Sequence, residues 1–178
     1  MRIISGKYKG RIIEAVNRAR PTQEKVRKAL FDILGDISGL SFLELFAGSG
    51  AVGFEAVSRG VRDLTLIEYN PGCLRVISKN IESLKLKTCS IYRAEAQRGI
   101  KRLHKEKKRF DIIFMDPPYQ LGLAKKTLQS LSDCDILAHT GFIIVQHFKK
   151  DELPSAEGNL ILFRQARYGD TVLSFYKK

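Results

Sequence analysis

The chain has 178 residues, which is enough for one domain with a full hydrophobic core. Its 44% hydrophobic and 28% charged residues are typical of a globular protein, and no apolar run is long enough to cross a bilayer. It carries 31 Lys and Arg against 19 Asp and Glu, and the net charge of +12 favours a polyanionic partner such as nucleic acid.

A short hairpin is predicted at the start of the chain. Residues 2–16 consist of two apolar pieces on either side of a Gly- and Lys-rich turn, and six Lys or Arg residues precede Pro21. A helix is predicted next over 22–34, because Thr22 can cap its first turn and Gly35 can end it. Its apolar face has helical spacing and consists of Val26, Ala29, Leu30, Ile33 and Leu34. The chain is therefore expected to divide into an arm, residues 1–20, and a main domain, residues 21–178.

Strand-like and helix-like segments alternate through the rest of the chain, which is the pattern of a mostly parallel α/β sheet. The predicted strands are 41–46, 63–68, 88–93, 110–115, 141–146, 159–165 and 171–176. Helices are predicted near 50–59, 71–84, 96–107 and 122–131, and the pattern around 133–140 fits a helix only weakly. The short connection between the last two strands favours a hairpin. We therefore expect a Rossmann-like, doubly wound sheet of seven strands with one antiparallel strand, preceded by the β-hairpin arm.

The cysteines and histidines favour neither a disulfide framework nor a metal site. Cys73, Cys89 and Cys134 are odd in number and none lies in a C-x-x-C pair, while the three histidines are scattered. The first twenty residues lack a continuous apolar segment, so no signal peptide is indicated. We therefore expect a cytosolic (cytoplasmic) protein without a metal.

The first motif that could carry chemistry is 43-LELFAGSGAVG-53, in which a strand ends in a glycine-rich turn and a helix follows. Gly48, Gly50 and Gly53 have the G-x-G-x-x-G spacing, which lets backbone N–H groups approach a ligand closely. Glu68 ends the next strand, about twenty residues later, where a carboxylate can accept both hydroxyls of a ribose. This pattern predicts a nucleoside-containing cofactor, but by itself it leaves both NAD and S-adenosylmethionine open.

The second motif, 110-FDIIFMDPPY-119, holds an acid and an aromatic ring at the end of a buried strand. Two consecutive prolines cannot continue a strand, because neither has a backbone N–H. An exocyclic amine on a base is a weak nucleophile, because its lone pair is conjugated with the ring. Acceptors such as the Asp116 carboxylate and the Pro117 carbonyl favour the form in which that lone pair leaves the ring plane. Tyr119 could stack on a base that is turned out of its RNA context.

These motifs resemble the class I S-adenosylmethionine-dependent methyltransferases that act on exocyclic amines of bases, and more closely the RsmD-type 16S rRNA guanine-N2 methyltransferases. The resemblance covers nearly the whole chain and is carried by 20-RPTQEKVRKALFDIL-34, 45-LFAGSGAVGFEAVSRG-60, 110-FDIIFMDPPY-119 and 168-YGDTVLSFY-176. It implies that residues 21–178 form a class I methyltransferase domain that uses S-adenosylmethionine. The implied substrate is a guanine N2 in 16S rRNA, at position 966 by family resemblance, in free rRNA or in a small-subunit assembly intermediate.

The resemblance also implies roles for individual residues. The implied catalytic residues are Asp116, Pro117 and Tyr119, and the implied cofactor-binding residues are Glu44, Phe46, Ala47, Gly48, Gly50, Glu68, Tyr69, Asn70, Glu95 and Ala96. Two positions depart from the family pattern, because Glu44 stands where the family usually has Asp and Gln146 stands where it often has Glu. The methionine end of the cofactor could therefore be held differently, and an ionic role at the end of the fifth strand is not expected.

Two basic segments are candidates for contact with RNA. The arm carries Arg11, Arg18 and Arg20, and with Thr22 it can lie over the catalytic edge, so we expect these four residues to bind rRNA. The segment 98–109 carries seven Lys and Arg residues. By topology it lies at the opposite edge of the sheet, so we expect it to be a solvated helix face and return loop.

The expected activity is methylation of a guanine N2 in small-subunit rRNA, and three other functions stay open. An adenine-N6 methyltransferase acting on DNA or RNA would use the same amine chemistry, but Asn commonly heads the DPPY motif in those enzymes. A noncatalytic RNA-binding assembly protein is disfavoured by the intact glycines, Glu68 and DPPY. An NAD-dependent oxidoreductase is disfavoured by DPPY and by the lack of a hydride-transfer site. No sequence feature indicates an oligomeric state.

Overall fold

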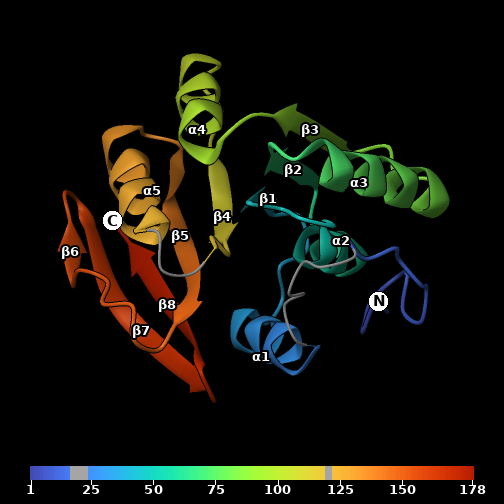
Figure 1. Ribbon diagram of the computed structural model, residues 1–178, viewed down its shortest axis with the longest axis horizontal. Helices are drawn as coiled ribbons and strands as arrows, with labels where there is room; N and C mark the ends of the chain where they lie inside the picture. The colour runs from blue at the N-terminus through green and yellow to red at the C-terminus, as the bar shows by residue number, and fades with distance from the viewer. Residues whose placement is uncertain (17–23, 119–121) are drawn as a thin grey trace.

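The computed structural model describes residues 1–16, 24–118 and 122–178, and its framework is one eight-stranded sheet with helices on both faces (Figure 1). The described helices are α1 (Glu24–Leu34), α2 (Ala51–Ser58), α3 (Pro71–Leu84), α4 (Ala96–Lys105) and α5 (Leu123–Asp133). The described strands are β1 (Ser41–Leu45), β2 (Asp63–Glu68), β3 (Cys89–Arg93), β4 (Phe110–Met115), β5 (Leu137–Phe148), β6 (Ala156–Glu157), β7 (Leu160–Tyr168) and β8 (Thr171–Lys177).

The strand order, β3-β2-β1-β4-β5-β8-β7-β6, locates the place where a ligand can bind. The strands from β3 to β5 pair in parallel, whereas β8, β7 and β6 each run antiparallel to the preceding strand in this order. After β1 the chain adds β2 and β3 on one side, and then crosses over to add β4 and β5 on the other. Such a switch of direction leaves a crevice outside the carboxyl ends of the two central strands, here β1 and β4.

The predicted fold class, an α/β fold with a mostly parallel sheet and antiparallel pairing, is confirmed, and all seven predicted strands are present. The structure differs in two details. The fifth strand already begins at Leu137, so no separate helix follows α5 in 133–140. An eighth strand, β6, pairs with β7, and β6 and β8 both run antiparallel to β5. Two residues are too few to show a strand periodicity, so sequence patterns could not indicate β6.

The hydrophobic core consists of two clusters, one on each face of the sheet. Phe42 of β1 packs in the cluster under α1, α2 and α3, while its neighbour Leu43 packs in the cluster under α4 and α5. This follows from the alternation of side chains along a strand. All five residues of β1 are buried, as expected for a central strand of a parallel sheet that is covered on both faces.

The arm packs against α2 and α3 and shares their core. Its two ends pair as an antiparallel hairpin, in which the N–H of Ile3 donates to the carbonyl of Arg11 at 3.0 Å. Ile3 and Ile13 are each only 2% exposed and belong to the cluster under α1, α2 and α3. The Glu55 carboxylate of α2 accepts hydrogen bonds from two backbone N–H groups of the arm. The predicted helix cap, Thr22, and the predicted arm boundary at residue 20 lie outside the described residues, so both stay predictions.

Candidate active site at the carboxyl edge of the sheet

The glycine-rich turn after β1 borders open space at the crevice. Phe46, Gly48 and Gly50 have left-handed backbone angles, with φ of 57°, 57° and 75°. The turn is closed by a hydrogen bond of 2.7 Å from the N–H of Gly50 to the carbonyl of Ala47. A Cβ added to Gly48 would meet no atom within 4 Å, whereas one added to Gly50 would lie 2.7 Å from the ring of Phe54. Gly48 is therefore the position at which a ligand can approach the backbone of the turn.

The third glycine has a packing role. A Cβ on Gly53 would lie 2.7 Å from a methyl group of Leu64 and 2.8 Å from Oε2 of Glu44, so only glycine lets α2 lie this close to the sheet. The N–H of Gly53 donates to Glu44 Oε2 at 2.8 Å. Glu44 is 3% exposed and lies in the core beneath α2. Its carboxyl group therefore braces the helix that follows the turn.

The pKa of Glu44 is raised to about 8, mainly by burial and in smaller part by the negative charges of Asp116 and Glu68, while the N–H of Gly53 opposes the rise. This carboxyl is therefore neutral at pH 7 in the folded protein and ionised in the unfolded chain. A neutral carboxyl group cannot form an ion pair with the ammonium group of a ligand, whereas an exposed carboxylate could. The expected cofactor contact of Glu44 stays a prediction, and its burial favours an indirect role through Gly53.

Stability should therefore depend on pH through Glu44. The protonated form of Glu44 contributes to the free energy of unfolding. This contribution is fully present below pH 4.5, the ordinary pKa of a glutamate, and is lost as the pH rises through about 8. Glu44→Gln has no proton to lose and should gain roughly 3 to 5 kcal/mol relative to wild type between pH 4.5 and pH 8. Urea unfolding at several pH values measures this difference. The exposed Glu82→Gln is the control, and equal pH dependence of Glu44→Gln and wild type would contradict the assignment.

Glu68 connects the glycine turn to the end of β2. Its Oε2 accepts from the N–H of Gly48 at 2.8 Å, and its Oε1 accepts from the N–H groups of Tyr69 and Asn70 at 2.9 and 2.8 Å. The side chain is 6% exposed, and these three backbone donors hold it in one orientation. Each carboxylate oxygen has two lone pairs, and Oε2 uses one of them for Gly48. The glycine turn and Glu68 therefore lie together, as the sequence predicts. Oε2 of Glu68 can accept a further hydrogen bond from a ligand hydroxyl.

The other residues expected at the cofactor lie along the carboxyl edges of β2 and β3. Tyr69 is 62% exposed, whereas the side chain of Asn70 caps α3 by accepting hydrogen bonds from its first turn. Glu95 precedes α4 and forms an exposed ion pair with Arg98 at 3.7 Å. Ala96 is buried. The ring of Tyr69 and the carboxylate of Glu95 are thus exposed at this edge, while Asn70 already has a structural partner.

The acid of the DPPY motif has a partner that the motif does not include. Asp116 follows β4 directly and is partly buried, and Pro117 is buried beside it. The amide Nε2 of Gln146, on β5, donates to Oδ2 of Asp116 at 2.8 Å. Gln146 is 4% exposed, and its Oε1 is buried without a hydrogen-bond partner among the described residues. Tyr119, the expected stacking residue, lies outside the described residues.

In the sequence, Gln146 stands out only as a departure from the family pattern. Its position gave a further signal, because it lies at the end of the strand that follows β4 in the parallel sheet. The carboxyl ends of neighbouring parallel strands share one edge, so a polar residue there is expected near Asp116. The structure therefore adds Gln146 to the candidate site.

The residues expected to bind RNA are described only in part. Arg11 is exposed, and its Nη2 donates to the backbone carbonyl of Ser83, at the end of α3, at 2.9 Å. Arg18, Arg20 and Thr22 lie outside the described residues. The side chain of Arg11 therefore lies against the end of α3. The expected RNA-binding role of Arg11, Arg18, Arg20 and Thr22 stays a prediction.

The residues that the structure describes offer neither a candidate metal centre nor a candidate membrane-spanning helix. They include no group of three or more His, Cys, Asp or Glu side chains placed to hold a metal ion. In the same ranges no helix is both long and apolar enough to span a membrane. All three cysteines are free.

Comparisons with known proteins agree with this geometry. Residues 1–177 match the family described as Conserved hypothetical protein 95. The chain is 32% identical over 181 residues to the Ribosomal RNA small subunit methyltransferase D of Escherichia coli (strain K12), covering 100% of this chain and 90% of that protein. It is 37% identical over 154 residues to the protein of the same name from Buchnera aphidicola subsp. Acyrthosiphon pisum, covering 85% and 80% of the two chains. The solved structure of yhhF from Escherichia coli, named as a methyltransferase, is similar with a TM-score of 0.87 and 31% identity, covering 100% and 97%.

Proposed function

Because this chain belongs to the family described as Conserved hypothetical protein 95, the RsmD family, and has the fold of class I methyltransferases, we propose that it methylates small-subunit rRNA with S-adenosylmethionine. We assign the target as a guanine N2, at position 966 by family resemblance. The observation that carries the proposal is the pairing of Asp116 with Gln146 beside the glycine turn. The names of the relatives from Escherichia coli and Buchnera support the substrate class.

The residues at the carboxyl edge fit S-adenosylmethionine. Gly48 borders open space, and the anchored carboxylate of Glu68 can accept from the hydroxyls of a ribose. Tyr69 and Glu95 are exposed on the adjoining strand ends, where an adenosine would lie. When bound, the cofactor supplies an electrophilic methyl group on a sulfonium sulfur. Phe46, Ala47 and Gly50 shape the turn, and Glu44 supports it from beneath.

The chemistry requires the target amine to lose its conjugation with the guanine ring. The Asp116 carboxylate and the Pro117 carbonyl accept its two N–H groups, and both interactions strengthen as positive charge develops on the nitrogen. Gln146 orients the carboxylate through its amide donor. The surplus proton then leaves to Asp116 or to water. Tyr119 holds the base by stacking in this scheme.

Mass-spectrometric mapping of methylated rRNA nucleotides, with and without the protein, tests the proposed function. Small-subunit particles and free 16S rRNA from cells that lack the protein serve as substrates. N2-methylguanine that appears only with the protein and S-adenosylmethionine supports the proposal. N6-methyladenine would contradict the guanine assignment, and RNA binding without methylation would favour an assembly protein. Calorimetry should detect binding of S-adenosylmethionine and not of NAD.

Gln146→Met is expected to lower kcat by about tenfold, because it keeps the side-chain volume but removes a hydrogen bond to a charged group. The loss should appear in kcat and not in the affinity for S-adenosylmethionine, because the amide donor acts on the Asp116 carboxylate. Stability should not fall, because the variant also removes the buried, unpartnered Oε1. Gln146→Glu should not recover the activity, because an ionised carboxylate has no N–H to donate and repels the Asp116 carboxylate. An unchanged kcat in Gln146→Met would exclude a role for this residue in positioning Asp116.

A further inference from the structure

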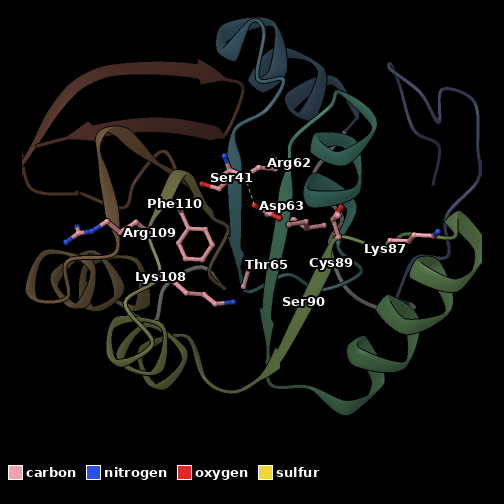
Figure 2. A pocket seen from close by; sticks show the side chains of 12 residues that line it. Ser41, Arg62, Asp63, Thr65, Lys87, Cys89, Ser90, Lys108, Arg109 and Phe110 are labelled. Carbon is pink, nitrogen blue, oxygen red and sulfur yellow. Dashed lines mark hydrogen bonds and ion pairs between the residues drawn. The ribbon is translucent and has the colours of Figure 1, made fainter.

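A hollow of about 530 Å³ lies at the amino edge of the sheet, on the side opposite to the candidate active site. It is formed by the first residues of β1 to β4 and by the turns that precede them, and Figure 2 shows its side chains. We call it the amino-edge pocket. Its cationic lining residues are Arg62, Lys87, Lys108 and Arg109. Asp63 is the carboxylate in the same lining, so positive charge predominates.

The pocket arises from the way two helices return to the sheet. The chain leaves α3 through Lys85 and leaves α4 through Lys107, both in left-handed conformation, with φ of 54° and 55°. Lys87 then precedes β3, and Lys108 precedes β4. In the order β3-β2-β1-β4 these two basic turns are three strand spacings apart, or roughly 14 Å. The starts of β1 and β2 form the floor between them.

Two of the four cations remain available to a ligand. Arg62 is paired with Asp63 at 2.7 Å, and Arg109 with Asp135 at 2.5 Å. Lys87 is exposed and has no hydrogen bond or ion pair among the described residues, and Lys108 lies 5.6 Å from the centre of the Tyr92 ring. Neither Lys87 nor Lys108 forms a salt bridge in the described part of the chain, and the carboxylate whose charge Lys108 feels, Glu106, is already bonded to Arg102.

The remaining polar groups of the pocket are hydroxyls. Thr88 and Ser90 are exposed, and Ser41 and Thr65 are buried in the floor. Lysine, arginine and hydroxyl side chains are the groups that contact phosphate oxygens in nucleic-acid complexes. The aromatic ring in the lining, Phe110, is only 3% exposed and offers no face on which a base could stack. The pocket is therefore suited to a sugar-phosphate backbone and not to bases.

We propose that the amino-edge pocket binds the phosphodiester backbone of the RNA substrate, as a second contact away from the catalytic edge. The inference rests on the proposed function for the identity of the RNA. The parallel strands between the two edges contain five or six residues, so the contacts lie roughly 17 to 20 Å apart. Successive phosphates of one strand are only about 3.4 Å apart along a duplex, so one RNA segment can reach both basic turns. Segment 98–109, expected from sequence to be only solvated, thereby contributes Lys108 to binding.

The test compares RNA binding by wild type and by Lys87→Gln/Lys108→Gln at several salt concentrations. Poly(U) is the probe for backbone contact, and small-subunit particles are the probe for the substrate. Loss of two phosphate contacts should reduce the slope of log K against log[salt] by about 1.4 for a single strand. The same relation predicts binding about 25-fold weaker at 0.1 M salt than for wild type.

A matched control is Arg164→Gln/Lys177→Gln, which removes two cations from β7 and β8. Its salt slope should stay as in wild type, and an equal loss in both double variants would overturn the proposal in favour of a general charge effect. Lys87→Gln alone should reduce the slope by about 0.7 with an unchanged Tm, because Lys87 is exposed and forms no hydrogen bond or ion pair with a described residue. Wild-type salt slopes in both Lys87→Gln and Lys87→Gln/Lys108→Gln would also overturn the inference. Failure of the proposed function gives a different result: wild type then methylates no guanine N2 in rRNA, while poly(U) binding still depends on Lys87.

Discussion

Asp116→Ala is expected to lower the single-turnover methylation rate by about 100- to 1000-fold, the range found when one preorganised charge-stabilising group is removed from an active site. The effect should appear in the rate and not in cofactor affinity, because the carboxylate acts on charge that develops on the amine. Its place at the end of β4 and its hydrogen bond to Gln146 at 2.8 Å motivate the expectation. Quenched-flow assays with radiolabelled S-adenosylmethionine measure the rate, and calorimetry measures the affinity.

Two further variants separate catalysis from folding. Asp116→Asn should lose less activity than Asp116→Ala, because an amide oxygen still accepts a hydrogen bond. Asp111→Ala removes a carboxylate from the opposite end of the same strand, where it accepts hydrogen bonds from Ser41. It should leave the chemical step unchanged in folded protein, as judged by a melting curve. Wild-type single-turnover rates in both Asp116 variants would show that the proposed mechanism is wrong.

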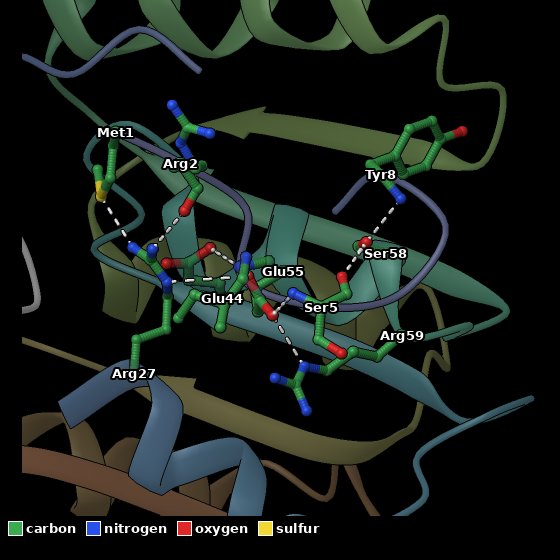
Figure 3. A network of polar contacts seen from close by, with 11 residues as sticks. Met1, Arg2, Ser5, Tyr8, Arg27, Glu44, Glu55, Ser58 and Arg59 are labelled. Atoms are coloured by element: carbon green, nitrogen blue, oxygen red, sulfur yellow. Dashed lines mark hydrogen bonds and ion pairs between the residues drawn. The ribbon is translucent and has the colours of Figure 1, made fainter. Parts of the chain in front are cut away.

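Glu55→Ala is expected to reduce the free energy of unfolding by about 3 to 5 kcal/mol, the usual cost of leaving one member of a buried ion pair without its partner. Glu55 and Arg27 have side chains that are 0% and 1% exposed, and their charged atoms approach to 4.0 Å. Burial lowers the pKa of Arg27, and the charge of Glu55 opposes that shift. The same carboxylate accepts from the N–H groups of Ile4 and Ser5 at 2.7 and 3.1 Å, as Figure 3 shows in part.

Urea unfolding, together with hydrogen exchange of the first sixteen residues, measures this expectation. Protection in the arm should be lost before the sheet unfolds, because Glu55 bonds the arm to α2. The exposed Glu82→Ala on α3 is the control and should change stability by less than about 0.5 kcal/mol. The double variant Arg27→Met/Glu55→Gln should recover part of the loss, because the fully buried Arg27 charge is then removed together with its partner. A loss below about 1 kcal/mol in Glu55→Ala would contradict the importance of this pair.

The chemistry-bearing positions could be found from sequence because they depend on local backbone rules. Gly48 and Gly50 have positive φ, a conformation that costs glycine little, and their spacing marks the turn in any tertiary context. Pro117 and Pro118 lack N–H groups, so the strand had to end beside Asp116 whatever its neighbours were. The alternation of apolar runs was likewise enough to predict a mostly parallel sheet.

Contacts between distant segments could not be read from such rules. Gln146 is 30 residues from Asp116, and only the pairing of β4 with β5 brings their side chains to one edge. The burial of Glu44 beneath α2 depends on how closely Gly53 lets that helix lie.

The attachment of the arm through Glu55 and the amino-edge pocket also depend on strand order and helix packing. Backbone preferences act within a few residues, whereas burial and charge pairing depend on which elements pack together. The turn and the place of Asp116 at the end of β4 therefore follow from local chemistry, and the partners that orient them follow from the assembled sheet.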